Sequence, residues 1–136
     1  MRLGYTIIYV ADVPDTIAFY EKAFGAQRRF VTEDGTYGEL DTGAVTLSFA
    51  DQTFIKDGLG FDFRANGAGS LAPGFEVGFV TDDVETAWHT AVDAGATALI
   101  EPKQKPWGQT VAYVRDINGI LVEICSLMAP TADPDA

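Results

Sequence analysis

Cysteine and histidine are almost absent from the chain, and this narrows its possible chemistry. Cys125 is the only cysteine among 136 residues, so neither an intramolecular disulfide nor a cysteine-based zinc site can form. His89 is the only histidine, so a Ser-His-Asp arrangement would need this one residue, which we expect within a helix beside Trp88. We expect Cys125 to be a buried, unreactive thiol and His89 to be solvated.

Basic residues and long apolar runs are also scarce. Nine Lys and Arg stand against 20 Asp and Glu, giving a net charge of −11, which repels phosphate backbones and anionic membranes. No apolar run approaches the roughly 18 residues of a membrane span, and no secretory signal pattern opens the chain. We therefore expect a cytoplasmic protein that binds neither nucleic acid nor membrane. Its acidity suits a cationic small ligand, although acidity also serves solubility alone.

The sequence contains an internal repeat. Six identities recur at one offset, pairing Gly4 with Gly74, Val10 with Val80, Asp12 with Asp82, Thr16 with Thr86, Gly25 with Gly95 and Ala26 with Ala96. Such self-similarity predicts two copies of one supersecondary unit. Function is then expected at the seam between the copies, where duplicated half-sheets leave a cavity.

The first copy, residues 1–50, predicts the order βαβββ. Strands are expected at 4–10, 27–32, 37–41 and 44–50, with a helix that begins after Asp12 and ends at Gly25. Thr42-Gly43 is expected to form a two-residue hairpin turn. The second copy, residues 74–128, repeats the order. Its strands are expected at 75–80, 97–101, 109–114 and 120–126, its helix ends at Gly95, and Asn118-Gly119 is a strong hairpin signal.

The segment 51–73 separates the copies, and residues 129–136 follow them. Glycines, phenylalanines and weak periodicity in 51–73 predict a linker, and two interpretations are open: a flexible connector, or a lid over the cavity. Residues 129–136 are rich in Ala, Pro and Asp and are expected to be a disordered tail.

These features together resemble a known family. The Val10-Ala11-Asp12 opening, Phe19-Tyr20, the Pro106-Trp107-Gly108 turn and the closing run 114–123 are similar to the vicinal oxygen chelate superfamily, which includes glyoxalase I, extradiol dioxygenases and bleomycin resistance proteins. The resemblance covers residues 3–127. It implies an α+β fold of two paired βαβββ modules whose curled sheets enclose a central cavity.

The resemblance also implies where a metal would lie in the metal-dependent members, which use two His and one or two Glu. The two His positions fall on Tyr5 and Glu76, the first Glu position falls on Thr46 or its neighbour Leu47, and only Glu123 matches the pattern. Because this chain has only one histidine, it cannot supply two imidazole ligands, and we expect no cofactor. If a divalent ion binds at all, Tyr5, Glu76 and Glu123 are its oxygen donors.

Strand alternation assigns these positions to one side of each sheet. Tyr5 and Tyr9 share a face opposite Ile8 and Val10, which belong under a helix. By the same rule, the side lining the cavity carries Tyr5, Tyr9, Thr46, Ser48, Glu76 and Glu123. We expect Glu76 and Glu123 to face each other across one cavity, with a raised pKa for at least one of them. They either hydrogen-bond to Tyr5 or Thr46 or act as counter-charges for a ligand.

Trp107 completes the predicted ligand site. The resemblance to bleomycin resistance proteins implies that Trp107 borders a planar ligand, and the alternative is a structural plug under the 51–73 loop. The sequence thus predicts a homodimeric small-molecule binder of the drug-sequestering kind, with a small aromatic or cationic ligand and no catalytic residue. The alternatives are a metal-dependent lyase or isomerase of the glyoxalase type, and a structural or interaction module with a vestigial pocket.

Overall fold

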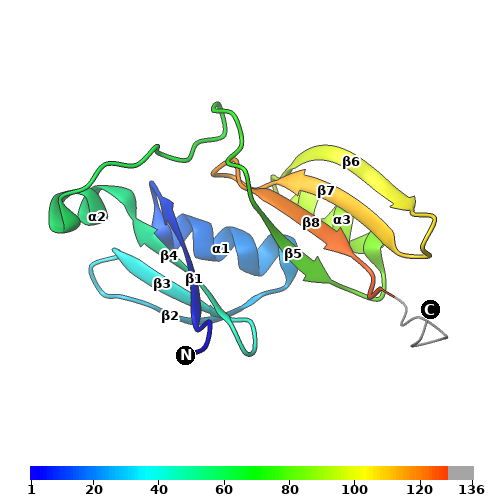
Figure 1. Cartoon of the computed structure of the whole chain (residues 1–136), viewed down its shortest axis with the longest axis horizontal. Helices are drawn as coiled ribbons and strands as arrows, with labels where there is room; N and C mark the ends of the chain where they lie inside the picture. The colour runs from blue at the N-terminus through cyan, green and yellow to red at the C-terminus, as the bar shows by residue number, and fades with distance from the viewer. Residues whose placement is uncertain (129–136) are drawn as a thin grey trace.

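The computed structural model describes residues 1–128, which form two four-stranded sheets lying side by side, each covered on one face by a helix (Figure 1). The first sheet has the order β1 (Tyr5–Val10), β4 (Thr46–Asp51), β3 (Tyr37–Asp41), β2 (Gln27–Val31), and the second has β5 (Glu76–Val80), β8 (Leu121–Cys125), β7 (Thr110–Arg115), β6 (Thr97–Gln104). In each sheet the first strand pairs in parallel and the other pairs are antiparallel. The predicted α+β fold of two βαβββ modules is confirmed. The two sheets do not close into a barrel.

The two long helices begin and end where their capping residues stand. In α1 (Val13–Phe24) the carboxylate of Asp12 accepts from the Asp15 amide, and Gly25 ends the helix with φ 66°. In α3 (Val84–Asp93) the Asp83 carboxylate accepts from the Thr86 amide. Each helix lies on the sheet of its own module, and the two helices pack on each other. Among residues 1–128, no helix is long and apolar enough to cross a membrane.

A single core runs through both modules. The expected alternation holds, since Ile8 and Val10 of β1 and Val122 and Ile124 of β8 are all buried beneath the helices. Aromatic rings continue the core from one module to the other. The ring centroid of Tyr20 in α1 lies 4.9 Å from that of Phe49 in the same module and 6.3 Å from that of Phe79 in β5.

A buried hydrogen-bond network also joins the modules. The Tyr20 hydroxyl of α1 donates to the carboxylate of Asp116, which follows β7 and is 1% exposed. The same carboxylate accepts from the amides of Asn118 and Ile120, and the Asn118 side chain donates to the Thr16 hydroxyl of α1. The Asp116 turn of the second module is therefore held by the helix of the first.

The connections differ from the expected ones in detail. The β3–β4 turn spans residues 42–45 rather than two residues, because the Thr42 side chain donates to the Val45 carbonyl and accepts from the Leu47 amide, which closes a wider turn. The Asn118-Gly119 signal does mark the β7–β8 hairpin, with Gly119 at φ 81°. Strand β6 runs on to Gln104, past the expected end at 101, with two register shifts against β7.

The segment between the modules is not loop throughout. It begins with α2 (Gln52–Leu59), capped by the Asp51 carboxylate and ended by Gly60 at φ 68°. Beyond α2 the chain crosses from one module to the other (Figure 1). Residues 60–73, here called the strap, are tied at both modules: the Asn66 amide donates to the Tyr9 carbonyl, and the Arg115 guanidinium donates to the carbonyls of Gly67, Ala68 and Ser70. The boundaries at 50 and 73 stay predictions, and the predicted disordered tail lies outside the described residues.

Candidate functional site

The face of each sheet that carries no helix, here called its open face, holds most of the residues singled out from the sequence. On β1 the side chains of Tyr5 and Ile7 are 57% and 47% exposed, whereas their neighbours Ile8 and Val10 are buried. On β5 Glu76 and Gly78 alternate with the half-buried Val77 and Phe79. The pleat thus assigns the polar and aromatic residues of both modules to the faces opposite the helices.

Glu76 and Glu123 are neighbours on the open face of the second sheet. They come from the paired strands β5 and β8, in which Glu123 lies opposite Gly78 and two positions along from Glu76. The expectation that they face each other across a cavity is therefore wrong, because parallel pairing places both on one sheet. Partial burial raises the pKa of Glu123, and the negative charge of the neighbouring Glu76 raises it further.

Tyr113 completes a polar group with these carboxylates. It lies directly opposite Glu123 on β7, and burial, followed by the charges of Glu123 and Glu76, raises the pKa of its phenol. Cys125 follows on the same face of β8. Burial is the main cause of its raised thiol pKa, and Glu123 adds to the effect. The predicted buried thiol is confirmed. The group is an acidic patch, and a cation beside it would stabilise its charged forms.

Trp107 lies at the end of this face. It sits on the β6–β7 turn, is 55% exposed, and its indole donates to the side-chain carbonyl of Gln109. The Gln109 amide in turn donates to the Ser126 carbonyl beyond β8. Gln109 therefore connects the turn to the strand that carries Glu123. His89, in contrast, is exposed on α3, where it pairs with Glu85.

The candidates of the first module lie together on the other open face. In the parallel pair of β1 and β4, Tyr5 stands opposite Thr46 and Tyr9 opposite Ala50, with Ser48 opposite Ile7 between them. Thr46 and Ser48 are buried, while Tyr5 is exposed. Tyr9 makes an edge contact with Phe63 of the strap, at 4.8 Å between ring centroids. The strap therefore covers the Tyr9 end of this face.

Sequence reasoning missed the charged residues of this first face. Arg29 of β2 donates to Glu39 at 3.1 Å, to Thr46 at 3.1 Å and to Asp41 at 3.4 Å. The Tyr37 hydroxyl donates to the second oxygen of Glu39 at 2.7 Å. Tyr37 and Glu39 lie two positions apart on β3 and therefore share one face of the sheet. Strand alternation could have predicted this from the sequence. Arg29 sits in a register shift between Arg28 and Phe30, so simple alternation could not place it.

The seven sequence candidates thus form two groups on separate sheets. Tyr5, Tyr9, Thr46 and Ser48 share the first open face, and Glu76, Glu123 and Trp107 share the second. The sheets have no hydrogen-bonded strand pair in common. Any ligand that uses both groups has to bridge the two faces.

The residues at the metal positions do not fit a transition-metal centre. The positions carry a phenol at Tyr5, a hydroxyl at Thr46 and carboxylates at Glu76 and Glu123, with no imidazole or thiolate among them. Across residues 1–128, His, Cys, Asp and Glu do not gather in any group of three or more that could hold a metal ion.

The two βαβββ modules, with their matching strand orders, define a paired-module protein of the glyoxalase kind. The model of the Glyoxalase/Bleomycin resistance protein/Dioxygenase superfamily matches residues 2–124, and the chain belongs to this superfamily. No curated protein is similar enough to the chain to count as a match.

Solved structures show the same fold at low sequence identity. A glyoxalase-related enzyme from Fulvimarina pelagi superposes with a TM-score of 0.76 at 19% identity, over 93% of this chain and 88% of that one. A family enzyme from Burkholderia phytofirmans PsJN gives 0.71 at 22% identity, over 93% and 98%. TioX from Micromonospora sp. ML1 gives 0.69 at 19% identity, over 93% and 98%. At such identities the likeness concerns the fold.

Proposed function

We propose that this protein is a small-molecule binder that sequesters a planar aromatic cation on its open faces, without making or breaking a bond. In this proposal it acts in the cytoplasm as a homodimer, in the manner of the bleomycin resistance members of its superfamily. The ligand stacks on Trp107 and on the Tyr5/Tyr9 side of the first sheet, and Glu123 supplies the counter-charge.

The observation that carries the proposal is the carboxylate pair on the second open face. Neither Glu76 nor Glu123 forms an ion pair within residues 1–128. The basic residue of β7, Arg115, is occupied elsewhere, because its guanidinium donates to the strap carbonyls and to the carbonyl of Gly119. Two adjacent carboxyl groups without a basic partner are stabilised by a cation that docks beside them.

Exposed aromatic rings supply the second half of the proposed site. Trp107 and Tyr5 are both more than half exposed. A planar cation over such a ring gains about 0.5–2 kcal/mol from the ring quadrupole, and burial of its apolar area adds to this. Arg29 on the first face is already paired with Glu39 and Asp41, so it adds little repulsion.

The exposure of the same faces supports the proposed homodimer. Large apolar side chains, including Ile7 at 47% and Val80 at 56%, lie uncovered on the open sides of β1 and β5. A second copy laid over them would remove this area from water and close the ligand between two walls. We expect the purified protein to sediment as a single species with twice the mass of one chain.

Tryptophan fluorescence tests the ligand site directly. We expect proflavine and similar planar cationic dyes to quench Trp107, and we expect Trp107→Ala to abolish the quenching, since the remaining Trp88 is only 6% exposed. Glu123→Gln should weaken binding of the cationic dyes while leaving a neutral analogue unaffected. Equal quenching in wild type and Trp107→Ala would refute the stacking role. If no dye binds even at millimolar concentration, the vestigial-pocket alternative is the better one.

Elemental analysis separates this proposal from the glyoxalase-type lyase or isomerase. The position of Glu123, which matches the acidic ligand of the metal-dependent relatives, is the observation that keeps this alternative. The donor set predicts that protein purified without chelators carries no stoichiometric Zn²⁺, Ni²⁺ or Fe²⁺. About one such ion per chain, lost in Glu123→Gln, would favour the enzyme instead.

A further inference from the structure

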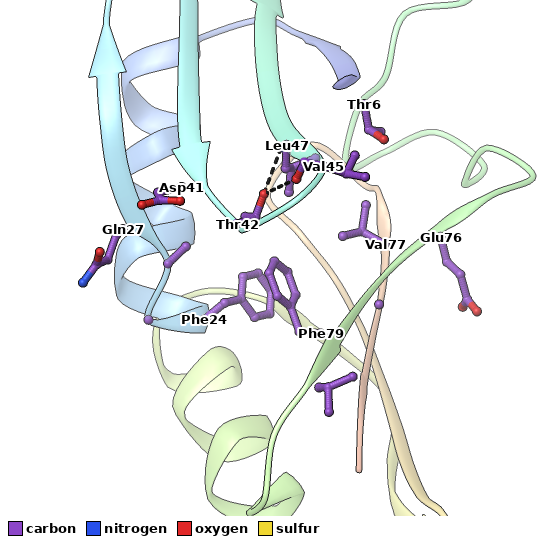
Figure 2. Close-up of a pocket in the computed structure, with 14 residues that line it drawn as sticks. Thr6, Phe24, Gln27, Asp41, Thr42, Val45, Leu47, Glu76, Val77 and Phe79 are labelled. Carbon is purple, nitrogen blue, oxygen red and sulfur yellow. Dashed lines mark hydrogen bonds between the residues drawn. The ribbon is translucent and has the colours of Figure 1, made fainter. Parts of the chain in front are cut away.

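A hollow lies at the seam between the modules, at the facing edges of the two sheets, and residues from both sides of β5 line it. Its volume is about 780 Å³. It occupies the space between the β3–β4 turn at Thr42–Val45, the end of α1 at Phe24, and strand β5 (Figure 2). We call this hollow the seam groove. It exists because β1 and β5 are edge strands of two separate sheets, so no ladder of hydrogen bonds draws them together at this end.

The floor of the seam groove is aromatic and aliphatic. The rings of Phe24 and Phe79 stack at 5.0 Å between centroids with an interplanar angle of 15°, and both residues are only half-buried. Val77 and Leu47 extend the apolar surface beside them. Partly uncovered rings of this kind offer a flat surface to another planar molecule.

The rim of the seam groove keeps a fixed shape. The Thr42 hydroxyl donates to the Val45 carbonyl at 2.6 Å and accepts from the Leu47 amide at 3.1 Å (Figure 2). The turn is thereby held open over the Phe24–Phe79 pair. A hollow of several hundred cubic ångströms that is formed before binding is typical of a small-molecule site.

The charge around the seam groove is of one sign. Asp41 and Glu76 are its charged lining residues, and no Lys, Arg or His among residues 1–128 lines it. Figure 2 shows Glu76 turned away from the Phe24–Phe79 pair, so Asp41 is the carboxylate on the ligand side. The Asp41 side chain is 56% exposed and accepts from Arg29 at the long distance of 3.4 Å. This environment repels anions and favours a cation.

We propose that the seam groove is a second ligand site, which binds a planar aromatic amine in its cationic form with its ring on Phe24 and Phe79 and its charge toward Asp41. The site overlaps the second open face along β5, where Glu76, Gly78 and Val80 border it, but its floor is formed by Val77 and Phe79 on the opposite side of that strand. A ligand in the seam groove requires neither Trp107 nor Glu123.

Site-resolved NMR titration of the intact chain with 9-aminoacridine tests the proposal. We expect saturable shifts of the amides of Gly25 and Val45, which line the seam groove. Neutral acridine should bind more weakly, and acridine-9-carboxylate should cause no shift there. Absence of shifts at Gly25 and Val45, or equal binding of the anion, would overturn the proposal.

Two variants locate the site, each with a control. Val45→Trp should fill the seam groove and raise the Kd for 9-aminoacridine at least tenfold, whereas Ala44→Trp, on the adjacent exposed residue that does not line it, should leave the Kd unchanged. Gln27→Arg, at an exposed rim position, should weaken binding of 9-aminoacridine about two- to fivefold and strengthen binding of acridine-9-carboxylate. A wild-type Kd in both Val45→Trp and Gln27→Arg would refute the proposal.

The open-face proposal can fail separately from this one. Trp107→Ala should leave the shifts at Gly25 unchanged, because Trp107 does not line the seam groove. Loss of the Gly25 shifts in Trp107→Ala would show that one open-face site explains all binding, and would overturn the seam groove site.

Discussion

Removing the Tyr20 hydroxyl tests the buried link between the two modules, on which the relative position of both proposed sites depends. In Tyr20→Phe the ring stays in place against Phe49, but the Asp116 carboxylate loses one of its three donors. A hydrogen bond to a charged group contributes about 1.5–3 kcal/mol, and no cavity larger than an oxygen atom is left. We expect the free energy of unfolding at pH 7 to fall by about this amount.

The pH dependence of the same variant has a definite sign. Burial raises the pKa of Asp116, while the hydrogen bond from Tyr20 opposes that rise. A carboxyl group whose folded-state pKa is raised contributes stability at low pH that is lost as the pH rises through that pKa. Because Tyr20→Phe raises the pKa of Asp116 further, its deficit should be larger at pH 7 than at pH 4.

Urea denaturation at both pH values, analysed at constant m, measures these differences. The matched control is Tyr37→Phe, which removes a half-buried phenol from Glu39 within one module, and Glu39 keeps Arg29 as a partner. We expect the control to cost only about 0.5–1.5 kcal/mol. A Tyr20→Phe protein within about 0.5 kcal/mol of wild type, or one no less stable than Tyr37→Phe, would refute the role of the link.

Two further predictions concern the second open face and the strap. Burial and the charge of Glu76 raise the pKa of Glu123 in the folded state. Protonated Glu123 therefore adds stability at low pH, and this stability is lost as the pH rises through the raised pKa. Glu123→Gln, which stays neutral, should thus raise the thermal midpoint more at pH 7 than at pH 4. An equal shift at both pH values in a calorimetric scan would contradict the coupling of the two carboxyl groups. Gly119 has φ 81°, and a Cβ there would meet the Arg115 side chain and the Gly67 carbonyl. Gly119→Ala should therefore lower the free energy of unfolding by more than the about 1–2 kcal/mol that a left-handed conformation alone costs. It should also speed amide hydrogen exchange at residues 66–70. Gly43→Ala, with φ 99° and open space around its Cβ, is the control that carries the backbone cost alone, and exchange as slow as in that control would count against the Arg115 anchor.

The sequence was sufficient to predict the periodic parts of this protein. The repeat from Gly4 to Ala26 and from Gly74 to Ala96 predicted two modules, and period-two alternation separated Ile8 and Val10 from Tyr5 and Tyr9. These features depend on backbone geometry within one strand or one helix, which neighbouring residues determine directly. The capping residues Asp12 and Gly25 set the ends of α1 for the same local reason.

Helix α2 shows where the local signal was present but overlooked. The phenylalanines and glycines of 51–73 suggested a linker, yet Asp51 caps the Phe54 amide and Gly60 ends the helix in the left-handed conformation. None of its residues is buried. A cap and a terminal glycine around a short exposed helix give a weaker pattern than an apolar stripe does, because little core packing accompanies them.

The arrangement of charges and hollows was decided by tertiary structure alone. Parallel pairing of β5 with β8 made Glu76 and Glu123 neighbours on one sheet, and a register shift in β2 turned Arg29 toward Glu39. The seam groove depends on the angle at which two unpaired strand edges separate, with Phe24 of one module stacked on Phe79 of the other. Residues 55 positions apart along the chain meet there only because the packed helices fix the orientation of the two sheets. No local periodicity encodes that orientation, since it results from side-chain packing summed over the whole core.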